Sequence, residues 1–138
     1  MNLIKEQLDY RDNILFGTPY EEIRYKSGGT SYFKAKPDKI QNLVDLHLID
    51  PEECQNDSPT ISELLEYAKH HPDGNFDLYG YAVSQTRPDA RVTIDAISIT
   101  GPRKITSEMA GFIEMYHWAD EMTVRSNWDD ITIKAWWD

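Results

Sequence analysis

The chain has 138 residues, of which 40% are hydrophobic and 12% aromatic, and its formal net charge is −10. A chain of this length and composition forms a globular domain with a hydrophobic core rather than a disordered segment. The excess of carboxylates opposes direct binding to nucleic acid or to an anionic membrane, because such contacts require clustered lysine and arginine.

The first half of the sequence predicts helices on either side of one strand. Apolar residues recur at helical spacing over 3–15 and again over 38–48, where a proline precedes the second pattern. The segment TSYFKA, residues 30–35, has the composition of a strand and is a candidate further strand. The capping pattern TPYE predicts a short helix over 19–25.

Two more helices are indicated in the second half. Thr60 and Glu63 form a capping-box pattern ahead of a helix over 61–71, whose apolar residues share one face. A threonine and a serine after Gly101 and a proline can cap a last helix over 107–119. These segments supply the helices that cover a sheet.

Three segments predict the sheet itself. Residues 76–84 and 91–99 are rich in β-branched and aromatic residues and are close enough in sequence to form an antiparallel hairpin. The apolar phase shifts along 91–99, which indicates either a bulge near Asp95 or a central strand covered on both faces. Residues 131–137 alternate cleanly, with Trp137 on the apolar face. The order of elements predicts an α+β fold with a small, mainly antiparallel sheet.

All four tryptophans lie in the last 21 residues, where five carboxylate side chains accompany two cations. Tryptophan is enriched where proteins bind one another, and acidic flanks steer basic partners. We therefore expect a partner-binding surface at this end of the chain, formed by Trp118, Trp128, Trp136, Asp129 and Asp130. An exposed Trp136 on an edge strand is also consistent with a homodimer.

No catalytic motif stands out in the sequence. There is no P-loop, no dinucleotide-binding glycine pattern, no nucleophile elbow and no complete set of metal ligands, so we expect neither a cofactor nor a metal. The leading hypothesis is a non-catalytic acidic protein-binding module, such as an inhibitor, immunity or accessory protein, that recognises a basic or amphipathic partner.

Two alternatives stay open. The first is a DNA mimic that antagonises a nucleic-acid enzyme, which requires rows of carboxylates at phosphate-like spacing. The second is a small-ligand binder or enzyme with a pocket between the hairpin and the last helix, where Asp95, Glu114 and His117 supply polar groups.

The sequence also bears on compartment and domain organisation. One cysteine cannot form an internal disulfide, and no segment reaches the ~18 apolar residues of a membrane span. The first residues lack the apolar run of a signal peptide. We expect a cytoplasmic protein with a single domain over 1–138, or else a helical part over 1–55 packed on a mixed part over 58–138.

Overall fold

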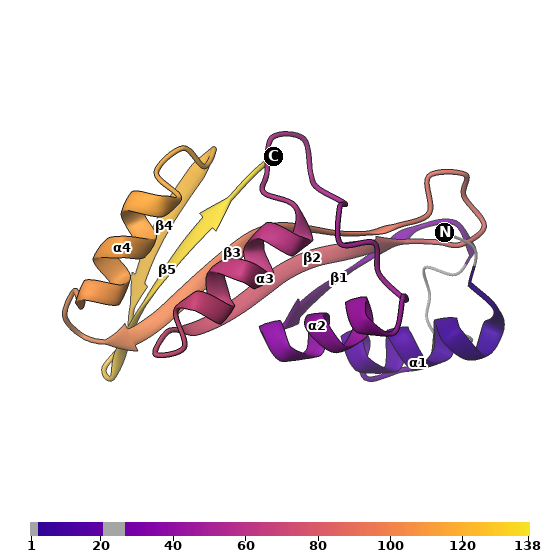
Figure 1. The fold of residues 1–138 in the computed structure, drawn as a ribbon, viewed down its shortest axis with the longest axis horizontal. Helices are drawn as coiled ribbons and strands as arrows, with labels where there is room; N and C mark the ends of the chain where they lie inside the picture. Colours follow the sequence, from indigo (N-terminus) through magenta and orange to yellow (C-terminus); the bar gives the residue numbers. More distant parts are fainter. Residues whose placement is uncertain (1–2, 21–26) are drawn as a thin grey trace.

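Figure 1 shows helices and one antiparallel sheet in the computed structural model, which describes residues 3–20 and 27–138. Within these residues the elements follow one another as α1 (Lys5–Phe16), β1 (Thr30–Ala35), α2 (Pro37–Asp45), α3 (Ile61–His70), β2 (Asn75–Val83), β3 (Val92–Pro102), α4 (Ser107–Met115), β4 (Glu121–Ser126) and β5 (Asp130–Trp136). The strands lie in the order β1-β2-β3-β5-β4, and each neighbouring pair is antiparallel. The predicted α+β fold class is confirmed.

The helices begin where the sequence offers capping residues. At the start of α3, the Glu63 N–H donates to Thr60 Oγ1 at 3.1 Å, and the Thr60 N–H donates to Glu63 Oε1 at 3.0 Å. This is the predicted capping box, which satisfies two backbone donors that the helix itself leaves unpaired. Pro37 occupies the first turn of α2, and Thr106 Oγ1 accepts from the Met109 N–H at the start of α4.

All the described helices lie on one face of the sheet. Alternate strand residues point toward them and enter the core, among them Phe33, Phe76, Leu78, Ile97, Ile99, Ile133 and Ala135. The core is one cluster that extends from Leu8 in α1 to Trp137 after β5. The residues between these point to the opposite side, which we call the open face, and include Tyr32, Lys34, Tyr79, Tyr81, Lys134 and Trp136.

A bulge interrupts the central hairpin. Ala96 pairs with Tyr79 and Ile94 pairs with Gly80, so Asp95 has no partner on β2. The bulge interpretation of the shifted apolar phase is confirmed. The extra residue shifts the alternation, so that Val92 and Ile94 before the bulge and Ile97 and Ile99 after it all enter the core.

The strand β4 was not predicted from the sequence, and its position changes that of β5. Its six residues, EMTVRS, include two apolar side chains on one face and two charges on the other, which is a weak strand signal. Because β4 lies at the edge, β5 is an internal strand. The expectation that Trp136 lies on an edge strand was therefore wrong.

Two helices end three or four residues earlier than predicted. The second helix stops at Asp45, and His47 has a φ of 60°, a left-handed conformation that ends the helix. The last helix stops at Met115, and a turn leads from there into β4. Residues 21–26 of the short helix predicted over 19–25 lie outside the described residues.

The two glycines Gly80 and Gly111 provide a matched test of packing. A Cβ on Gly80 would lie 2.1 Å from the backbone oxygen of Thr93, whereas a Cβ on Gly111 would meet nothing within 4 Å. We expect Gly80→Ala to lower the free energy of unfolding by about 1–3 kcal/mol through overpacking. Gly111→Ala should raise it by about 0.5–1 kcal/mol, because alanine favours helix more than glycine does. Urea denaturation measures both, and equal effects would contradict the close approach of β3 to β2.

Candidate functional site

The structure separates the predicted partner-binding residues into two groups. Trp128 is 91% exposed in the turn between β4 and β5. Asp129 and Asp130 lie beside it, and both their N–H groups donate to Asn127 Oδ1, at 2.8 and 2.9 Å. This hairpin tip is separated from the far end of β5 by the length of the strand, roughly 20 Å.

The second group lies at the other end of β5. Trp136 is half-buried on the open face, whereas Trp118 is 45% exposed on the helical side of the sheet. Trp137, the residue after Trp136, is 1% exposed in the core. Its ring centroid lies 5.1 Å from that of Trp118. The expectation that Trp137 is buried is confirmed, whereas Trp136, which was expected to be exposed, is half-buried.

A hollow of about 760 Å³ lies around Trp136 and joins three segments that are distant in sequence. Its lining residues are Asn56, Asp57, Asp120, Trp136 and Asp138. The Asn56 amide donates to the Asp138 backbone oxygen at 2.6 Å, and the Asp138 N–H donates to Asp120 Oδ2 at 2.8 Å. Figure 1 shows the corresponding approach of the end of β5 to the connection between α2 and α3. We call this site the carboxylate–tryptophan hollow.

Three carboxylates and one indole determine the chemistry of this hollow. Asp57, Asp120 and Asp138 are exposed, and no lysine or arginine is among the described residues that line it. Carboxylates attract a cation by charge, and the face of an indole attracts it through the ring quadrupole. The hollow is therefore suited to an ammonium or guanidinium group.

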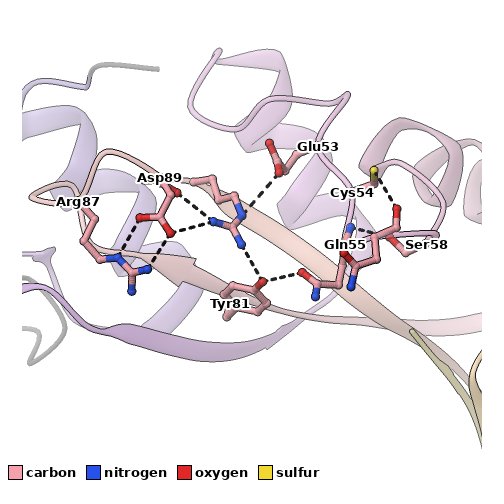
Figure 2. Close-up of polar contacts among 9 residues, drawn as sticks. Glu53, Cys54, Gln55, Ser58, Tyr81, Arg87 and Asp89 are labelled. Atoms are coloured by element: carbon pink, nitrogen blue, oxygen red, sulfur yellow. Dashed lines mark hydrogen bonds and ion pairs between the residues drawn. The ribbon is translucent and has the colours of Figure 1, made fainter. Parts of the chain in front are cut away.

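A network of polar contacts holds one wall of the hollow in place (Figure 2). Arg91 contacts Glu53 at 3.6 Å and donates to the backbone oxygen of Asp89 at 3.0 Å. It also donates to the Tyr81 hydroxyl at 3.0 Å, and that hydroxyl donates to Gln55 Oε1 at 2.6 Å. The central hairpin is thus tied to the loop that carries the wall.

The loop itself is a tight turn. The Gln55 N–H donates to Ser58 Oγ and the Ser58 N–H donates to the Gln55 backbone oxygen, both at 2.8 Å. Asn56, between them, has a φ of 49°, a left-handed conformation that asparagine tolerates well. The turn leaves Asn56 and Asp57 exposed at the hollow. No motif in the sequence marks this polar stretch, so the sequence analysis missed it as a site.

Asp95 lies near Trp136 rather than near the last helix. Burial raises the pKa of the Asp95 carboxyl above its usual range, and the Lys134 ammonium and the Trp136 side chain offset part of this effect. The carboxylate therefore belongs to the open face beside the carboxylate–tryptophan hollow.

The structure does not bring Asp95, Glu114 and His117 together. Glu114 is exposed in a groove between α3 and α4, and His117 is exposed beyond the end of α4. The space between the hairpin and α4 is filled by core side chains, including Phe76, Ile99, Met109, Phe112 and Tyr116. The ligand-pocket hypothesis therefore gains no support from this arrangement.

The open face carries charges of both signs. A second hollow of about 470 Å³ is lined by Tyr79, Glu121, Thr123, Arg125, Thr132, Lys134 and Trp136. The Lys134 ammonium lies 4.0 Å from the centroid of the Tyr79 ring. Because cations stand among the carboxylates here, this face does not support the rows of negative charge that a DNA mimic requires.

Protein-family models, curated proteins and solved structures yield no match to the chain. Within the residues that the structure describes, no three His, Cys, Asp or Glu side chains are grouped so as to hold a metal ion. In the same ranges, no helix has the length and apolar character needed to cross a membrane. Function is therefore inferred from the geometry of the site.

Replacing Arg91 tests whether the network positions the wall of the hollow. Arg91→Ala removes the contacts to Glu53 and Tyr81, and we expect faster hydrogen exchange at the amides of Gln55 and Ser58. The free energy of unfolding should fall because these contacts are lost. The fall should be only about 1–2 kcal/mol, because the ion pair is partly exposed and therefore weak. Arg103→Ala, at an exposed arginine after β3, is the control. Equal exchange rates in the two variants would show that Arg91 does not hold the loop.

The raised pKa of Asp95 predicts a pH-dependent gain in stability for Asp95→Asn. Because the folded state favours the protonated carboxyl, its contribution to stability is present at low pH and is lost as the pH rises through the folded pKa. The asparagine variant should therefore be more stable than the natural chain at pH 7, and the difference should vanish below about pH 4. Urea midpoints between pH 3 and 7 measure this. A variant less stable at pH 7 would contradict it.

Proposed function

We propose that the protein is a binding module for a basic partner protein, and that its carboxylate–tryptophan hollow receives a lysine or arginine side chain. The observation that carries the proposal is the grouping of Asp57, Asp120 and Asp138 around Trp136, with no lysine or arginine among the described residues that line the hollow. These groups come from three segments that are distant in sequence, so the fold assembles a negative, aromatic site that no single stretch of sequence contains.

Two physical effects of different range support this role. At long range, the net charge of −10 attracts a basic protein and raises its association rate. At short range, an exposed ion pair contributes about 0.2–1 kcal/mol, and a cation on an aromatic face contributes about 0.5–2 kcal/mol. One side chain in the hollow would then supply modest affinity, and further contacts are needed for a stable complex.

The hairpin tip offers such a further contact. A tryptophan that is 91% exposed leaves a large apolar surface in water, and tryptophan is enriched among the residues that dominate binding energy. Asp129 and Asp130 place negative charge beside Trp128 as well. A basic partner that spans roughly 20 Å along β5 would contact both sites. An inhibitor, immunity or accessory protein is the class of protein that this mode of binding fits.

Small probes test the hollow directly. N-acetylarginine amide should shift the indole N–H resonance of Trp136, which Trp136→Phe assigns, and the uncharged analogue N-acetylcitrulline amide should shift it at least tenfold more weakly. Asp120→Asn keeps an oxygen for the Asp138 N–H but removes one charge, so it should weaken arginine binding about 2–5-fold.

The control is Asp129→Asn, which removes the same charge at the hairpin tip. It should leave the arginine affinity of the hollow unchanged, apart from a small long-range effect that salt at 0.5 M suppresses. Equal binding of the arginine and citrulline compounds would contradict the proposal. So would an equal loss of affinity in both aspartate variants.

A further inference from the structure

The outer edge of β4 has a charge pattern that complements itself. The sheet order places β4 at the end of the sheet, with β5 on one side. Glu121 and Arg125 are exposed on the open face, and Val124 is 62% exposed on the helical side. An edge strand presents unpaired N–H and C=O groups that can pair with another strand. We propose that β4 pairs with β4 of a second copy of this chain, antiparallel, about a two-fold axis at Thr123.

This register matches every charged and apolar side chain of the strand. Thr123 of each copy lies opposite Thr123 of the other, so Glu121 lies opposite Arg125 of the second copy and Met122 lies opposite Val124. Directly opposite residues in an antiparallel pair share one face of the sheet. The two-fold axis repeats each contact, which gives two ion pairs on the open face and two apolar pairs on the helical face.

Other registers lose these matches. A slip of one residue places Met122 opposite Arg125 of the second copy and puts the helices of the two copies on opposite sides of the sheet. A slip that centres the axis on Met122 or on Val124 leaves Glu121 opposite no cation. A slip that centres it on Arg125 brings two guanidinium groups together. The side chains therefore select one pairing.

The dimer would place the Trp136 residues of both copies on one continuous face. A two-fold axis perpendicular to the sheet keeps both open faces on the same side. Trp136 lies opposite Glu121, two residues from the axis and one strand further in. With ~3.4 Å per residue and ~4.8 Å between strands, the two Trp136 Cα atoms lie roughly 20 Å apart. A partner with two basic side chains at that spacing would bind both hollows and gain from bivalency. This last consequence rests on the proposed function, whereas the dimer does not.

Reversal of the charges tests the pairing. Sedimentation velocity of the natural chain between 5 and 500 μM should show a monomer–dimer equilibrium with a Kd on the order of 10–100 μM, since only five residues of each strand pair and the interface is small. Glu121→Arg alone and Arg125→Glu alone each create like-charged pairs, and each should weaken the dimer at least tenfold. The double variant Glu121→Arg, Arg125→Glu should restore it.

Mixing the two single variants gives the sharpest result. The arginine introduced at position 121 of one variant then faces the glutamate introduced at position 125 of the other, so a heterodimer should form although neither variant dimerises alone. Glu66→Arg, an exposed reversal on α3, is the control and should dimerise like the natural chain. A monomer at 500 μM, single variants that dimerise normally, or a mixture that stays monomeric would overturn the proposal. The arginine-probe titration is independent of all three outcomes.

Discussion

The bulge at Asp95 is the constraint on which the site depends. The regular pairing of β3 with β5 runs from Ala96 to Pro102 on β3, so it stops beside the extra residue Asp95. The backbone oxygen of Asp95 instead accepts the Trp137 N–H at 2.9 Å. This bond fixes the chain so that Trp137 enters the core and Trp136 stays on the open face.

Internal pairing of cations explains why the hollow is negative. Arg87 is paired with Asp89, Arg91 contacts Glu53, and Lys36 contacts Asp77, so these positive charges are compensated within the fold. The Arg87 hydrogen bonds hold the pKa of the Asp89 carboxyl below its usual range, as expected for a bound carboxylate. Among the described residues, no ion pair joins Asp57, Asp120 or Asp138 to a cation, so the negative charge of these carboxylates is left at the hollow.

The sequence predicted what depends on local pattern and missed what depends on tertiary contact. The capping box at Thr60, the alternation that buries Trp137 and the bulge near Asp95 are all encoded within a few residues, and all three were confirmed. The strand β4 has a weak local pattern and exists because β5 supplies its partner. The hollow joins Asp57 to Asp120, and no spacing rule could connect these positions before the fold was known.

The edge strand shows how one pattern can serve two requirements. An unpaired edge risks pairing with any exposed strand, and proteins limit this risk with short strands and charged side chains. β4 has both features, since it is six residues long and carries Glu121 and Arg125. These charges disfavour an unrelated strand, because burial beside an apolar residue would cost desolvation free energy. They do not disfavour a second copy in the register centred on Thr123, where each finds an opposite charge. The same side chains therefore exclude unrelated strands and select self-pairing, and they lie on the face that carries Trp136.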